Sequence, residues 1–130
     1  MNSNNVVLDA SAVLAALYRE PGSDKISPEL LARAIISSVN LAEVHSKLVA
    51  QGWEIEQAWK DCSGVVDQVV PFTIEQAKRT GSLVSITRSL GLSLGDRACL
   101  ALALEHNAPV YTTERSWKNL KLDLQIVVIR

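Results

Sequence analysis

The strongest constraint in the sequence is an uninterrupted apolar run at residues 98–104, which lies two positions after the carboxylate of Asp96. A helix that is apolar on every side has to be buried. The run therefore predicts a core helix over residues 96–106, with Asp96 in its first turn. An acid in the first turn of a core helix either caps the helix or belongs to a functional site. The positions of the other acids help to separate these alternatives.

Short apolar segments alternate with helical patterns along most of the chain. Strands are predicted at residues 5–8, 34–37, 65–72, 108–112 and 125–129, and helices at 9–17, 40–51, 54–63, 73–90 and 96–106, the fourth of them weakly interrupted at Gly81. Residues 23–33 fit a short helix or an irregular segment, and Trp117 a short helical turn. This alternation is typical of βαβ units, which form a parallel sheet covered by helices on both faces. With no linker or repeat, residues 1–130 are predicted to form a single α/β domain.

Composition narrows the class of protein. The chain has 13 basic and 14 acidic residues and a formal net charge of −1, which argues against a large basic face for nucleic acid. Cys62 and Cys99 lie far apart without neighbouring histidines, so they indicate reduced core thiols rather than a zinc site or a disulfide. Neither a signal peptide nor an apolar run long enough to cross a membrane is evident. We therefore expect a cytoplasmic protein that makes no contact with a membrane.

Four acids fall at corresponding places in the predicted units. Asp9 closes the first strand, and Glu114 follows the fourth. Glu43 and Asp96 each fall in the first turn of a predicted helix, at residues 40–51 and 96–106. Because the carboxyl ends of parallel strands and the starts of the helices share one edge of such a sheet, all four are expected on the same rim.

Carboxylates gathered on one rim repel one another and raise one another's pKa values, and a divalent cation removes this repulsion. With no histidine or cysteine in the pattern, the oxygen ligands favour Mg²⁺ or Mn²⁺ over zinc.

Helix capping is the simpler explanation for each acid taken alone. Asp is a favoured N-cap residue, which suits Asp9. Glu43 fits the third position of a capping box that begins at Asn40, and Asp96 fits the same position behind Ser93. Capping does not explain why every acid falls on the same rim, and it is compatible with metal binding because a capping acid already has a fixed rotamer.

Four segments of the chain resemble the motifs of PIN-domain ribonucleases and occur in the same order. They are VLDAS at 7–11, NLAEV at 40–44, LSLGDRACLALA at 92–103 and TTERSW at 112–117. From about residue 5 to residue 130, the chain resembles the VapC-type toxins of bacterial toxin–antitoxin pairs.

This resemblance implies a three-layer α/β/α sandwich around a parallel sheet of four to five strands. It also implies Mg²⁺- or Mn²⁺-dependent hydrolysis of RNA with 5′-phosphate and 3′-hydroxyl products. A homodimer is implied too, together with a small antitoxin that blocks the acidic site.

Carried over position by position, the resemblance makes Asp9, Glu43 and Asp96 the catalytic and metal-binding acids, with Ser11 supporting the first of them. Glu114 departs from the family pattern, which usually has Asp there, and its extra methylene puts direct contact with the metal in doubt.

Neighbouring polar residues are weaker candidates for the same site. Thr112 and Thr113 would hydrogen-bond the acids or the phosphate, or simply end a strand and begin a turn. Arg97 and Arg115 would contact substrate phosphate or form solvated ion pairs.

Two other functions fit parts of the pattern. A non-catalytic PIN-like module that binds RNA or protein would explain Glu114 as a degenerate acid. A phosphate-accepting receiver domain is also a parallel α/β fold with clustered acids, but the chain lacks the acidic pair and the late lysine that such domains carry. The sequence therefore favours a metal-dependent endoribonuclease, with the binding module as the alternative.

Overall fold

The computed structural model describes residues 4–130, so Met1–Ser3 of the predicted 1–130 domain lie outside the described residues. Five parallel strands form one sheet in the order β3-β2-β1-β4-β5. The strands are β1 (Val6–Leu8), β2 (Ala34–Ser37), β3 (Gln68–Val70), β4 (Val110–Thr112) and β5 (Ile126–Val128). The predicted α/β class and parallel sheet are confirmed.

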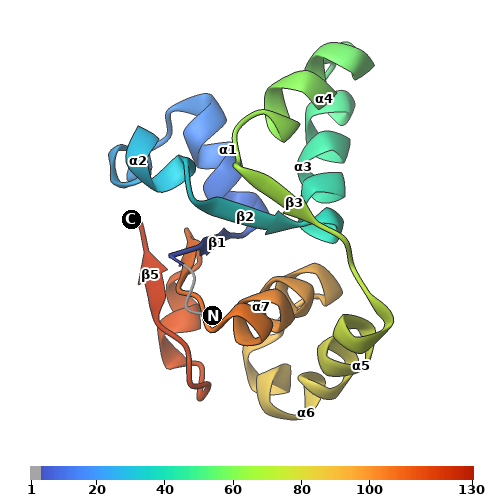
Figure 1. Ribbon diagram of the computed structural model, residues 1–130, viewed down its shortest axis with the longest axis vertical. Coiled ribbons are helices and arrows are strands. Elements are labelled where there is room, and N and C mark those ends of the chain that lie inside the picture. The colour runs from blue at the N-terminus through green and yellow to red at the C-terminus, as the bar shows by residue number, and fades with distance from the viewer. Residues whose placement is uncertain (1–3) are drawn as a thin grey trace.

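Helices cover both faces of the sheet, as Figure 1 shows. One face carries α1 (Ala10–Tyr18), α2 (Pro28–Leu31), α3 (Ser38–Ala50) and α4 (Ile55–Ser63), and the other carries α5 (Ile74–Ser82), α6 (Val84–Thr87) and α7 (Leu94–His106). Short 3₁₀ turns lie at η1 (Ser23–Lys25), η2 (Arg88–Leu90) and η3 (Arg115–Asn119).

Alternate residues of the central strands enter opposite cores, as the twofold period of a strand requires. Val6 and Leu8 of β1 pack into the core beneath α1, α3 and α4, whereas Val7 packs into the core beneath α7. All residues from Ala98 to Ala103 of α7 are buried. The apolar run thus forms a core helix, as predicted, and the three-layer arrangement is confirmed.

The order of the strands creates a switch point between β1 and β4. From β1 the chain moves outward to β2 and β3 and then returns past α5, α6 and α7 to β4 on the other side of β1. The connections on the two sides therefore diverge above the carboxyl ends of β1 and β4. In open parallel sheets this crevice is where ligands bind.

One long helix predicted at residues 73–90 is divided in the structure into α5, α6 and η2. The hydroxyl of Thr73 caps α5, accepting from the backbone N–H of Gln76 at 3.1 Å. The segment then passes through Thr80 and Gly81, which have weak helix propensity, and turns at Leu83, whose side chain is buried in the α7 core. Packing of Leu83 thus outweighs continuation of the helix.

Two further expectations from composition can be compared with the structure. Cys62 and Cys99 are both buried and neither is in a disulfide, as the sequence indicated. Across residues 4–130, no helix combines the length and the apolar character needed to cross a membrane.

Candidate active site at the carboxyl edge of the sheet

Asp9 follows β1 directly and begins α1 as its N-cap residue. Its Oδ1 accepts hydrogen bonds from the Ser11 hydroxyl at 2.7 Å and from the backbone N–H of Ala12 at 2.8 Å. Its Oδ2 accepts from the Thr112 hydroxyl at 2.6 Å. The predicted cap is present, but two of these donors are side chains that capping does not require.

Thr112 and Ser11 join the ends of β1 and β4 around this carboxylate. Thr112 is fully buried at the end of β4, and its hydroxyl oxygen accepts from the backbone N–H of Glu114 at 3.0 Å. The Ser11 hydroxyl oxygen likewise accepts from the backbone N–H of Thr113 at 3.0 Å. The supporting residues expected at this edge therefore fix the first acid and the loop after β4 in one hydrogen-bonded unit.

The environment of Asp9 disfavours its charge. Burial raises the pKa of Asp9 to about 6, against the lowering effect of its hydrogen bonds with Thr112, Ser11 and Ala12. The negative charge of Asp96 raises this pKa further. A buried acid that is both hydrogen-bonded and close to a second acid has the character of a functional carboxylate.

Asp96 lies in the first turn of α7, where it completes a capping box with Ser93. Its backbone N–H donates to the Ser93 hydroxyl at 3.1 Å, and its Oδ2 accepts from the Ser93 backbone N–H at 2.9 Å. The capping box predicted from the sequence is confirmed. It holds one carboxylate oxygen and leaves Oδ1 without a hydrogen-bond donor among residues 4–130.

Glu43 occupies a different helical position from the one predicted. The N-cap of α3 is Ser37, whose hydroxyl accepts from the backbone N–H of Val39 at 3.2 Å, and the helix begins at Ser38. Asn40 is therefore inside the helix rather than its cap, and Glu43 lies in the second turn. The prediction of a capping box from Asn40 to Glu43 is wrong because Ser37, at the end of β2, already caps the helix through the backbone N–H of Val39.

Asn40 instead connects Glu43 to α7. Its Nδ2 donates to Glu43 Oε1 at 2.8 Å and to the backbone carbonyl of Gly95 at 2.9 Å. Gly95 immediately precedes Asp96, so the Glu43 carboxylate lies beside the first turn of α7. In the sequence, the contact between Asn40 and Glu43 is indicated by their spacing, because residues three apart on a helix are neighbours.

The charges of all three acids act on one buried group, the thiol of Cys99. This thiol is fully buried, and burial raises its pKa well above the usual value. The charges of Asp9, Asp96 and Glu43 each raise the same pKa further. These acids come from α1, α3 and α7, so the fold gathers side chains that are far apart in the sequence around the start of α7.

The positions of the acids limit how they could hold a divalent cation. In the part of the chain that the structure describes, no three His, Cys, Asp or Glu side chains are placed to hold one metal ion. Mg²⁺, however, is usually held by only one or two carboxylates and keeps several waters. A pair of acids with a third acting through water is compatible with this arrangement.

The hydrogen bonds also leave acceptors available. Asp96 Oδ1 and Glu43 Oε2 have no donor among residues 4–130, and Asp9 Oδ2 has one donor. The Oδ1 of Asn40 is buried and has no hydrogen-bond partner in the same residues. Oxygen acceptors without donors suit a hard cation and its waters, so the residues fit Mg²⁺ or Mn²⁺.

The remaining candidates lie farther from this group. Glu114 is exposed after β4, and only its backbone N–H takes part in the Asp9 network. Arg97 turns toward α5, where its Nη1 donates to the carbonyl of Thr80 at 2.9 Å. Arg115 is exposed, and its Nε donates to the carbonyl of Arg130 at 3.0 Å. Neither arginine contacts the acids through a hydrogen bond within the described residues.

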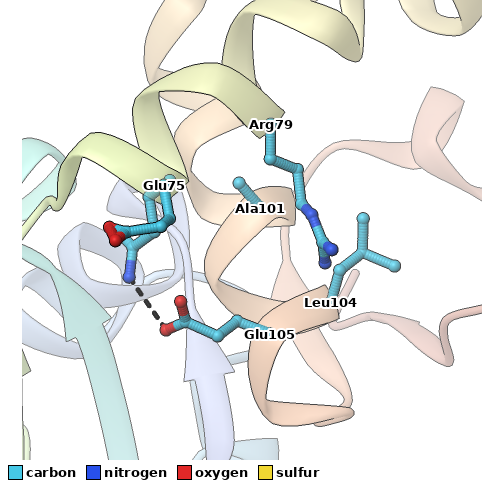
Figure 2. Close-up of a pocket in the computed structure, with 6 residues that line it drawn as sticks. Glu75, Arg79, Ala101, Leu104 and Glu105 are labelled. Carbon is cyan, nitrogen blue, oxygen red and sulfur yellow. Dashed lines mark hydrogen bonds between the residues drawn. The ribbon is translucent and has the colours of Figure 1, made fainter.

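A hollow between α5 and α7 is separate from the acid group (Figure 2). It has a volume of about 270 Å³ and is lined by Glu75, Gln76, Arg79, Ala101, Leu104 and Glu105. Gln76 Nε2 donates to Glu105 Oε2 at 3.0 Å across it. None of the four acids predicted for the site lines this hollow.

The model of the PIN domain family matches residues 6–121. No curated protein matches the chain.

Among solved structures, the chain is similar to a Rickettsia felis VapBC2 complex bound to a promoter DNA fragment, at 22% identity and a TM-score of 0.72, covering 93% of this chain and 96% of that one. It is also similar to Mycobacterium tuberculosis VapC20, described as a sarcin–ricin loop cleaving toxin, at 13% identity and a TM-score of 0.75, covering 93% and 99%. A DNA-bound VapBC complex from Salmonella typhimurium matches at 17% identity and a TM-score of 0.74, covering 97% of each chain.

Proposed function

This chain belongs to the PIN domain family, and from that membership and the acid group we propose that it is a metal-dependent endoribonuclease. We further propose that it is the toxin of a type II toxin–antitoxin pair. Its catalytic group is Asp9, Glu43 and Asp96, with Ser11 and Thr112 holding the first acid. Mg²⁺ or Mn²⁺ is the proposed cofactor.

One observation supports this proposal above the others. The Glu43 carboxylate of α3 lies beside Gly95, the residue before Asp96 in α7. The charge of Asp96 also acts on Asp9, the N-cap of α1, and all three acids raise the pKa of the buried Cys99 thiol. Capping accounts for Asp9 and Asp96 but not for Glu43, which is in the second turn of α3 and caps nothing within that helix. The convergence of three carboxylates is expected for a cation site and is costly without one.

The reaction is hydrolysis of an RNA phosphodiester bond. When bound, a divalent cation would activate water and offset the charge that develops on the phosphate. Asp9 and Asp96 would hold the cation, and Glu43 would act directly or through water. A carboxylate of this group would also accept the proton of the attacking water.

Glu114 and the arginines have secondary roles in the proposal. Because Glu114 is exposed and held only through its backbone, its carboxylate would act through water or on a second, weaker cation. Thr113 and Arg115 lie on the same loop and would contact the RNA backbone. For Arg97, which is turned toward α5, reaching the phosphate requires a change of rotamer.

The proposed partners follow from the family and from the neighbouring structures. Several similar structures are VapBC complexes, and we propose a cognate small antitoxin for this chain and a homodimer as its own assembly. An antitoxin would inhibit the nuclease by covering the acid group, ideally with a basic side chain. An RNA substrate also agrees with the expectation that the protein works in the cytoplasm.

The alternative is a non-catalytic PIN-like module that binds RNA or protein. The exposure of Glu114 and the absence of a three-ligand group within residues 4–130 favour it. Such a module would bind a divalent cation or RNA without cleaving the RNA.

RNA cleavage by the purified protein separates the two functions. Structured and unstructured RNAs are incubated with Mg²⁺, Mn²⁺ or EDTA, and the protein is compared with Asp96→Asn. Glu29→Gln is the matched control, because Glu29 is also an acid in the first turn of a helix, α2, but is exposed and its side chain makes no hydrogen bond within residues 4–130. The nuclease predicts chelator-sensitive cleavage that Asp96→Asn abolishes and Glu29→Gln retains. Stabilisation by metal without cleavage by any of the proteins would favour the binding module.

A further inference from the structure

The carboxylate of Glu43 reaches the start of α7 only because of two residues that are not acids, Asn40 and Gly95. Glu43 lies on α3, and Asp96 lies on α7. The contact between these helices is therefore what brings the second acid to the third.

Gly95 is in the first turn of α7 and is buried. A Cβ added at this position would lie 2.5 Å from Glu43 Oε1 and 2.6 Å from both Cδ and Oε2. Glycine is among the weakest helix formers, and Gly95 is not among the glycines with a left-handed backbone. The backbone thus gives no reason for glycine here, whereas the Glu43 carboxylate occupies the space of the missing side chain.

Asn40 supplies the complementary restraint. It is 1% exposed on α3, and its Nδ2 donates both to Glu43 Oε1 at 2.8 Å and to the Gly95 carbonyl at 2.9 Å. These two acceptors fix the orientation of the amide, because the opposite orientation would place Oδ1 against two oxygens. Oδ1 is then left without a donor among residues 4–130.

We propose that Asn40 and Gly95 are positioning residues that hold the Glu43 carboxylate beside Asp96, and that both act on metal binding through Glu43. This inference rests on the proposed function only in its expectation that the site binds a metal ion. Gly95 provides the space, and Asn40 provides the hydrogen bond that keeps the carboxylate in it. The pair thus places an acid side chain within the contact between the two helices, beside the direct hydrogen bond from Asn40 to Gly95.

Gly95→Ala is the sharpest variant. The atoms nearest the added methyl group are at the flexible end of Glu43, so the helix is expected to remain intact while the carboxylate is displaced. Gly81→Ala is the matched control, because Gly81 is also a helical glycine, in α5, and nothing lies within 4 Å of a Cβ added there. Thermal unfolding of each variant verifies that it is folded.

Mn²⁺ binding, measured by electron paramagnetic resonance or calorimetry, gives the first readout. Gly95→Ala and Asn40→Ala are each expected to raise the dissociation constant at least about tenfold, within the range of about 10–100-fold seen for residues that orient metal ligands. In a Glu43→Ala background the same two substitutions should have no further effect, because they act through Glu43. Equal losses in both backgrounds would overturn the proposal.

The second readout does not require metal. The side-chain amide protons of Asn40 are followed by NMR in metal-free protein, and Gly95→Ala is expected to shift them by displacing their acceptor, whereas Gly81→Ala is not. Unchanged Asn40 signals in Gly95→Ala would overturn the proposal. If these signals shift but the unsubstituted protein binds no Mn²⁺, the positioning is supported and the proposed metal-dependent function fails.

Discussion

The hydroxyl of Thr112 donates to Oδ2 of Asp9 at 2.6 Å, joining residues that are 103 positions apart in the chain. Thr112 ends β4 and Asp9 follows β1, so the bond spans the switch point of the sheet. It gives the buried acid a fixed orientation at the place where an open parallel sheet binds its ligand.

Thr112→Val tests the importance of this bond for stability. Valine has nearly the same shape and suits a strand, so the main changes are loss of the donor to a buried carboxylate and loss of the acceptor for the Glu114 backbone N–H. We expect a decrease of about 1.5–3 kcal/mol in the free energy of unfolding at pH 7, typical of a hydrogen bond to a charged group. Urea unfolding measures it, with Thr113→Val as the control, whose side chain makes no hydrogen bond within the described residues. Equal effects of the two substitutions would show that the bond contributes nothing.

Asp9→Asn is expected to stabilise the metal-free protein. In the folded state the pKa of Asp9 rises from 3.8 to about 6, so the folded protein binds this proton more tightly than the unfolded chain does. Stability therefore falls as the pH rises from about 4 to about 6, and the difference corresponds to about 3 kcal/mol. Asparagine removes this penalty while keeping an acceptor for Ser11 and Ala12.

The pH dependence of that gain is the specific part of the prediction. Denaturant unfolding in EDTA at pH 7 should show Asp9→Asn more stable by about 1–3 kcal/mol. At pH 4, where the folded protein carries a protonated Asp9, the gain should largely disappear. A gain that is the same at both values would mean that ionisation of Asp9 has no part in it.

Mn²⁺ or Mg²⁺ should stabilise the unsubstituted protein, because binding to the folded state alone shifts the unfolding equilibrium. The rise in Tm should be larger at pH 7 than at pH 5, since a protonated carboxylate is a poor ligand. Asp9→Asn and Asp96→Asn should abolish the rise, and EDTA should reverse it. The result is inconsistent with the proposed site if the rise persists in both variants.

Glu114→Gln should reduce RNA cleavage less than Asp96→Asn does. Glu114 is exposed and joins the Asp9 network through its backbone N–H alone, and glutamine retains that N–H. Initial cleavage rates of both variants at saturating Mg²⁺ provide the comparison. Equal losses would show that Glu114 binds the cation directly despite its extra methylene.

The parts of the molecule that sequence predicted well are those determined locally. The apolar run of α7 and the caps formed by Asp9 and Ser93 depend on residues within four positions of one another, so pattern and spacing suffice. The parallel sheet followed from the alternation of strands and helices. Its switch point placed Asp9 and Thr112 together, as expected for the carboxyl edge.

The sequence predictions were wrong where contacts between residues far apart in the chain determine the structure. The start of α3 moved to Ser38 because Ser37 ends β2 and caps the helix from there, which the spacing of Asn40 and Glu43 conceals. The function of Asn40 depends on the carbonyl of Gly95, 55 positions away. The helix predicted at 73–90 breaks where Leu83 packs against α7. The helix and strand propensities of neighbouring residues do not predict these contacts.

The most direct test of the central claim is the anomalous scattering of Mn²⁺ in crystals of the protein. We predict a peak at the carboxylates of Asp9 and Asp96, adjacent to Glu43, that is absent in crystals of Asp96→Asn grown at the same Mn²⁺ concentration. A protein that cleaves RNA but shows no peak at these acids, or a peak that persists in Asp96→Asn, would contradict the account.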